Sequence, residues 1–90
     1  MARKLFTVET AFLIEGRGII LVPGIVPEGS EKFRVGDAIN LRLQDGTCNQ
    51  TRIADLCLPT PNPRHVVIVL LPKDIGKDDV PVGTEVWSID

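Results

Sequence analysis

The chain has 90 residues, a length that accommodates one domain and not two. Hydrophobic residues make up 43% and charged residues 24% of it, a globular composition that excludes disorder. The formal net charge is −2, so the total lacks the basic excess typical of free-standing nucleic-acid-binding and membrane-surface proteins.

The N-terminal third of the chain predicts two strands. Residues 6–14 place apolar side chains at even positions, a period of two that predicts a strand with one buried face. Glu15-Gly16-Arg17-Gly18 follows as a tight turn, because two glycines supply the backbone freedom that such a turn needs. Residues 19–26 predict the next strand, bent or bulged at Pro23-Gly24, since proline cannot donate a hydrogen bond to a ladder.

The middle of the chain predicts a hairpin. Residues 34–44 are apolar at odd positions and form the clearest strand, and Asp45-Gly46 is a strong turn signal. The return strand covers residues 47–58. A plain two-residue turn would place polar residues beside the apolar side chains, so we prefer a turn with a bulge residue, which sets Ile39 beside Ile53 and keeps one face drier.

The last third adds two more strands. Residues 59–63 contain three prolines and predict an extended loop, and residues 66–71 are a fully apolar strand. Residues 84–89 form the final strand, which carries Trp87. Short strands separated by Gly/Pro turns predict an all-β domain over residues 1–90, a small closed six-stranded antiparallel barrel, because closure removes exposed edges.

Two motifs carry a family resemblance. Gly16-Arg17-Gly18, followed by the Val/Ile-rich run and the polar loop up to residue 29, precedes a strand opened by Val35-Gly36-Asp37. With the closing segment at residues 70–83, this order resembles the second domain of elongation factor Tu-type translational GTPases, here as a stand-alone domain covering roughly residues 5–89. The resemblance implies Greek-key connections in the barrel and a translation-associated role in binding RNA or the ribosome. The chain has no phosphate loop of the Gly-x4-Gly-Lys-Ser/Thr type, so we expect no GTP binding.

Four basic residues are candidates for anion binding. Arg17 between two glycines is either an exposed guanidinium that binds a carboxylate or phosphate, or a solvated turn residue, or one member of an ion pair with Glu15 or Glu28. Arg64 and His65 follow the proline-rich loop. Together with Arg52 on a neighbouring strand they form a small basic patch, or they are scattered along a solvated rim.

The strand at residues 66–71 is the best candidate for an interface. A strand in a small barrel normally buries one face, so its outward half needs cover from the chain itself or from a partner. The outward residues that we single out are Val66, Ile68 and Leu70, with Ile20 on the strand at residues 19–22. Burial of apolar area and pairing at a strand edge would provide the binding.

Other chemistry is not indicated. Cys48 and Cys57 match no zinc spacing, and we expect two reduced, half-buried thiols and no metal or cofactor. No nucleophile–base motif is present, so an enzyme ranks last. No apolar run approaches the ~20 residues of a membrane span, and we expect a cytoplasmic protein. The first hypothesis is a non-enzymatic module that binds a protein partner or itself, and the alternative is the RNA- or ribosome-binding module implied by the resemblance.

Overall fold

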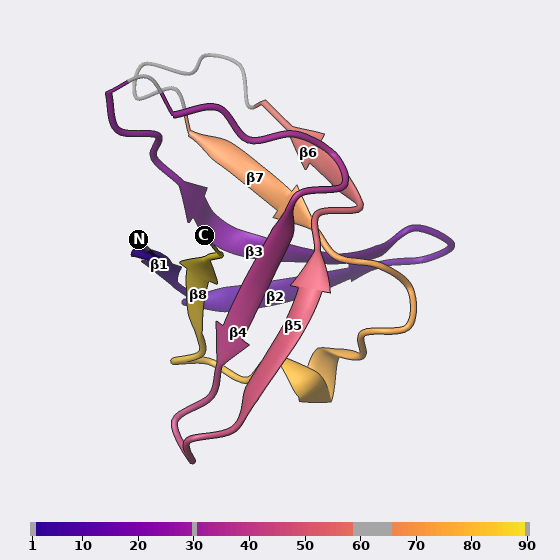
Figure 1. Ribbon diagram of the computed structural model, residues 1–90. Coiled ribbons are helices and arrows are strands. Elements are labelled where there is room, and N and C mark those ends of the chain that lie inside the picture. The colour runs from indigo at the N-terminus through magenta and orange to yellow at the C-terminus, as the bar shows by residue number, and fades with distance from the viewer. Residues whose placement is uncertain (1, 30, 59–65, 90) are drawn as a thin grey trace.

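The computed structural model describes residues 2–29, 31–58 and 66–89, which form an all-β architecture of two four-stranded antiparallel sheets (Figure 1). The first sheet has the order β1-β8-β4-β5, with bounds Lys4–Thr7, Glu85–Ser88, Ala38–Arg42 and Cys48–Arg52. The second has the order β2-β3-β7-β6, with bounds Thr10–Ile14, Gly18–Ile25, Val67–Leu70 and Asp55–Cys57. The helical element among the described residues is a short 3-10 turn, η1 (Lys77–Asp79).

Both sheets contribute one face to a shared hydrophobic core. The core side chains are aliphatic except for one phenylalanine, and along β3 and β4 they occupy alternate positions, as a half-buried strand requires. They are Leu5, Phe6, Val8, Ala11, Ile19, Leu21, Ile25, Ile39, Leu41, Ile53, Val69, Leu71, Val80 and Val86. Since these residues come from both sheets, the two inner faces pack against each other.

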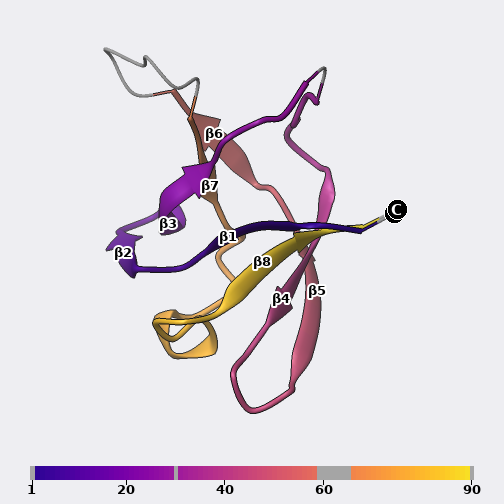
Figure 2. The same cartoon turned by 90° about the vertical axis from the view of Figure 1, so that its left-hand side faces the viewer.

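The strand pairing defines two sheets of four, where the sequence predicts six strands closed in a barrel. Two of the predicted strands are each divided, because the chain passes from one sheet to the other within two residues (Figure 2). At the first crossing Val8 N donates to Thr84 O at 2.8 Å, and Glu9 N donates to Val22 O at 2.9 Å. At the second crossing Ile53 and Ala54 likewise bond to opposite sheets. No closed barrel is found among the described residues.

The first crossing changes which side of the chain is buried. The even-numbered Phe6 and Val8 are in the core, as predicted, but Ala11 is the core residue of β2, and Phe12 and Ile14 are exposed. The prediction of one buried face along residues 6–14 is therefore wrong beyond Val8. The reason is that β1 and β2 belong to different sheets, each with its own inward side.

The β4–β5 hairpin has a different register from the predicted one. Ile39 lies opposite Thr51, not Ile53, and Leu43 N donates to Thr47 O at 2.8 Å. The loop thus has three residues, and Gly46 at its end has a φ of +92°, which fits the glycine of a hairpin bulge. The predicted direction of the register shift is wrong, because the extra residue belongs to the loop and not to the return strand.

The predicted break at Pro23-Gly24 is confirmed. The register between β3 and β7 shifts between Leu21 and Ile25, where four residues of β3 lie against two of β7, and both Leu21 and Ile25 are in the core. A Cβ on Gly24, whose φ is +103°, would lie 2.7 Å from Val67 O. The bulge therefore brings two backbones into a close approach that only glycine permits.

Candidate protein interface

The outer side of the β2-β3-β7-β6 sheet carries a row of apolar side chains. Register pairs Phe12 with Ile20 across β2 and β3, and pairs Ile20 with Leu70 across β3 and β7. Asp55 on β6 pairs with Leu70 and ends the row. Because Ala11, Ile19, Leu21 and Val69, their neighbours along the strands, point into the core, this row points away from it.

Six apolar residues on this side form what we call the outer apolar face: Phe12, Ile14, Ile20, Val22, Ile68 and Leu70. Phe12 is 54% exposed and Ile14 is 36% exposed, whereas Ile20, Val22 and Ile68 are half-buried. Leu70 is buried, with 5% of its area exposed. An outer sheet face is normally polar, so a continuous apolar one is a candidate binding surface.

An ion pair borders this face. Arg17 Nη2 lies 3.0 Å from Asp55 Oδ2, and the two side chains are 63% and 43% exposed. A shallow hollow of about 140 Å³ lies beside the pair, lined by Ile14, Arg17, Ile20, Cys57 and Leu70. The face therefore combines an apolar centre with one cation and one carboxylate at its margin.

Local sequence positions Arg17 at this margin. Arg17 N donates to Ile14 O at 3.0 Å and closes the turn between β2 and β3. A Cβ on Gly18 would lie 2.3 Å from Leu71 O, so only glycine lets β3 start this close to the end of β7. Arg17 is in an ion pair, as one alternative predicted, but the predicted partners Glu15 and Glu28 are wrong. The partner is Asp55, which the register of three strands brings near.

The structure brings together most of the predicted interface residues. Ile20, Ile68 and Leu70 lie on the outer apolar face. Val66 directly precedes β7 and is half-buried, with its Cγ1 3.0 Å from where a Cβ on Gly24 would lie. The predicted pairing of a partner strand is not possible at β3 or β7. Both β3 and β7 are inner strands of the sheet, so a partner can contact their side chains but not a free backbone edge.

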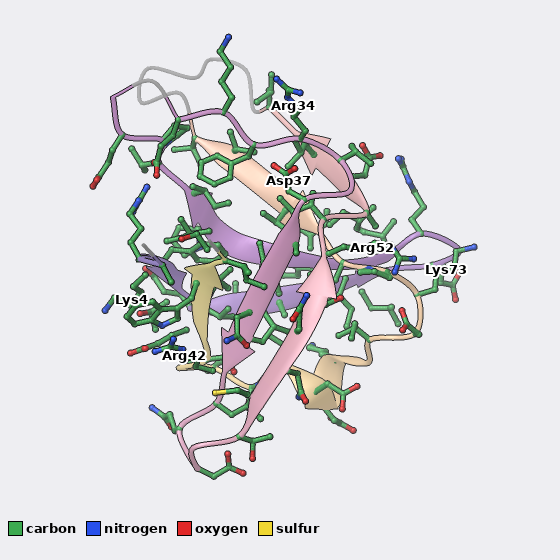
Figure 3. The ribbon with its side chains drawn as sticks, in the orientation of Figure 1. Lys4, Arg34, Asp37, Arg42, Arg52 and Lys73 are labelled. Atoms are coloured by element: carbon green, nitrogen blue, oxygen red, sulfur yellow. The ribbon has the colours of Figure 1, made fainter. Side chains whose placement is uncertain are left out.

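The predicted basic patch is not assembled from described residues. Arg52 lies on β5, the edge strand of the other sheet, and Figure 3 shows it on the side of that sheet remote from Lys4. Arg17 therefore belongs to one sheet and Arg52 to the other. Arg64 and His65 lie outside the described residues, and the patch that includes them stays a prediction.

Three members of the outer apolar face, Phe12, Ile14 and Val22, are absent from the predicted interface residues. A signal for Phe12 and Ile14 exists, because residues 11–14 are four consecutive apolar residues, the same pattern that singles out residues 66–71. Alternation along residues 6–14 obscured it, since the even positions are apolar on both sides of the crossing at Val8 and Glu9.

The two cysteines lie on opposite sheets. Both are free and exposed, so the expectation of half-buried thiols is wrong. Cys57 faces outward beside Ile68, and Cys48 faces outward beside Arg42 on β4. Within residues 2–29, 31–58 and 66–89, no group of three or more His, Cys, Asp or Glu side chains could hold a metal ion. The helical part of that same stretch contains nothing long and apolar enough to cross a bilayer.

Compared with protein-family models, with curated proteins and with solved structures, the chain gives no match in any of the three. The resemblance to the second domain of elongation factor Tu-type GTPases, and the translation role that it implies, therefore stay predictions from the sequence.

Proposed function

We propose that this chain is a non-enzymatic interaction module that self-associates through the outer apolar face. The observation that carries the proposal is the row Phe12, Ile20 and Leu70, which runs across three strands on the side away from the core. Burying such a row removes apolar area from water, which is the main driving force of protein association.

A second copy of this chain is the occupant that best fits the face. In a two-fold contact the same patch meets itself, so its charges must be self-complementary. Arg17 and Asp55 supply one charge of each sign at the margin, and both side chains retain exposed area that a second copy can contact. Two copies therefore meet without an excess of like charge.

The size of the face indicates a weak dimer. Four strands spaced about 4.8 Å apart, with about 3.4 Å per residue over five residues, give a footprint of roughly 300 Å². A standard stable interface buries about 800 Å² per partner. We therefore expect a dimer that forms at high concentration and dissociates on dilution. Contact with a different protein is the alternative occupant, and it would leave the pure chain monomeric.

Sedimentation velocity from micromolar to millimolar protein tests this proposal. Ile20→Asp places a charge at the centre of the face, and Asn40→Asp is the matched control, with the same charge change on the outer side of the other sheet. The wild type and the control should shift towards dimer with concentration, whereas Ile20→Asp should stay monomeric. Phe12→Ser, at an exposed position, repeats the test should Ile20→Asp unfold.

A wild type that stays monomeric at millimolar concentration would overturn self-association. Dimerisation of Ile20→Asp and Phe12→Ser with unchanged affinity would place the contact elsewhere on the molecule.

The finer fold that we propose is a six-stranded Greek-key barrel. Support comes from the edge strands: β1 of one sheet runs into β2 of the other, and β5 runs into β6. Counting each of these as one bent strand reduces eight strands to six, and every edge then continues into the opposite sheet. Slow amide hydrogen exchange at Val8 and Ala54, which donate at the two crossings, is the expected result. Fast exchange at both would contradict closure.

A further inference from the structure

The outer side of the β1-β8-β4-β5 sheet holds an arginine stacked on a tryptophan. Arg42 Cζ lies 3.9 Å from the centroid of the Trp87 ring, and the Trp87 indole Nε1 donates to Glu85 Oε1 at 2.9 Å. The register places Arg42 directly opposite Glu85 on β8, and Asn40 opposite Trp87. The contact with the ring holds the guanidinium in a defined orientation on this face.

Arg42 has hydrogen-bonding capacity that the described part of the chain does not use. Its Nε is buried and has no hydrogen-bond partner. None of the ion pairs between described residues includes Arg42, although Glu85 is its neighbour in the ladder. The Glu85 carboxylate accepts from Trp87 instead. A guanidinium carries five N–H donors, and four of these are on the two terminal Nη atoms, which make no ion pair with a described residue and are therefore open to an incoming acceptor.

A hollow of about 340 Å³ lies beside this side chain. Its lining includes Arg42, Gln44, Gly46, Cys48, Gly83 and Glu85. Gly83 has a φ of +95°, and a Cβ there would lie 2.5 Å from Gln44 Nε2, so the glycine lets the Gln44 carboxamide lie against the chain. The hollow thus offers a guanidinium and a neutral amide donor, and its volume exceeds the ~30 Å³ that one water occupies in the liquid.

We propose that this hollow binds an oxyanion, a carboxylate or a phosphate group, through Arg42. The buried Nε leaves the two terminal Nη atoms for a ligand, and two parallel N–H donors match the two oxygens of either anion. Gln44 supplies a further donor from the β4–β5 loop. Glu85 also lines the hollow, and its negative charge opposes the binding of an anion. Arg52 lies opposite Ala38, four residues along β4 from Arg42, and Figure 3 shows the two arginines well apart, so Arg52 takes no part in this site.

Trp87 is a direct reporter for the test, because the chain has one tryptophan and no tyrosine. Acetate and inorganic phosphate are titrated separately at constant ionic strength, following Trp87 fluorescence and the melting temperature, which rises when a ligand binds the folded state. The wild type should show a saturable response to at least one of the two anions. The acetate arm identifies a carboxylate ligand, and the phosphate arm identifies a phosphate ligand.

Variants of the two opposed charges make the test specific. Arg42→Gln should weaken binding by at least about tenfold, and Arg42→Lys, which keeps the charge and loses the fork, should fall between it and the wild type. Glu85→Gln keeps an oxygen for Trp87 and should tighten binding by about threefold, since it removes a like charge. Arg52→Gln is the matched control and should bind as the wild type does.

The melting-temperature arm is needed because Arg42→Gln also changes the surroundings of the indole. No saturable response to either anion in the wild type would overturn the proposal. Equal affinity in Arg42→Gln, or weaker binding in Glu85→Gln, would also overturn it.

Discussion

The outer sides of the two sheets differ in chemistry although their inner sides share one core. The outer side of the β2-β3-β7-β6 sheet presents Phe12, Ile20 and Leu70 in a row. On the outer side of the β1-β8-β4-β5 sheet, β4 and β8 present Arg42 and Trp87. A folded domain needs only the inner sides to be apolar. The fold alone therefore does not require the apolar outer side, and the two proposals above assign a protein contact to this side and an anion to the other.

The largest expected effect separates the two sides of a single strand. Leu21→Ala removes a fully buried core side chain and should lower the free energy of unfolding by about 2–5 kcal/mol. Ile20→Ala, its neighbour on the outer apolar face, loses only half-buried area and should cost about 1 kcal/mol. Urea unfolding at a concentration where the chain is monomeric measures both. Equal losses would mean that Ile20 belongs to the core, and the comparison between inner and outer sides would fail.

The next largest effect on stability concerns the ion pair between Arg3 and Glu31, next to β1. Arg3 Nε donates to Glu31 Oε2 at 2.9 Å, and this contact, together with the N–H of Glu28 that donates to Glu31 Oε1, lowers the pKa of Glu31 from 4.5 to about 2. A depressed carboxyl pKa means that the pair stabilises the fold above pH 4.5, and that this contribution is lost as the pH falls through about 2.

Glu31→Gln should therefore lower the melting temperature at pH 7, and the difference from the wild type should shrink between pH 4.5 and pH 2. Thermal unfolding by circular dichroism across this range is the measurement. A gap that stays constant down to pH 2 would show that the carboxylate charge plays no part.

The smallest effect concerns the ion pair at the margin of the outer apolar face. Arg17 and Asp55 are 63% and 43% exposed, against 28% and 33% for Arg3 and Glu31, so solvent screens their attraction more strongly. Arg17→Ala should change the free energy of unfolding of the monomer by less than about 1 kcal/mol. A loss of several kcal/mol in urea unfolding would mean that this pair holds the sheet together, which its exposure argues against.

Local patterns in the sequence predict the strands but not how they are divided between sheets. Alternation, apolar runs and turn residues locate six strands, which the structure divides into eight, and they also locate the bulge at Pro23-Gly24. What local reading misses is the crossing at Val8 and Glu9, where the chain changes partners without a turn residue to mark it. The inward side changes there, so the exposure of Phe12 depends on contacts with strands remote in sequence.

The candidate sites show the same division. Ile20, Ile68 and Leu70 could be predicted because they lie in two continuous apolar runs of the sequence, residues 19–22 and 66–71, whose strands are apolar on both faces. The pairing of Arg17 with Asp55 could not, since it depends on the register of β3, β7 and β6. The stacking of Arg42 on Trp87 joins residues that are 45 positions apart, and only the β4–β8 ladder brings them together.

The two free cysteines allow the most direct test of self-association through the outer apolar face, because the outer side of each sheet carries one. Cys57 lies beside the outer apolar face, and Cys48 lies on the outer side of the other sheet. Alkylation by excess iodoacetamide, followed for each cysteine by mass spectrometry, compares their rates at micromolar and millimolar protein. We predict that Cys57 reacts more slowly at the higher concentration while the rate of Cys48 stays constant. Rates that are independent of protein concentration at both cysteines would contradict burial of the outer apolar face by a second copy.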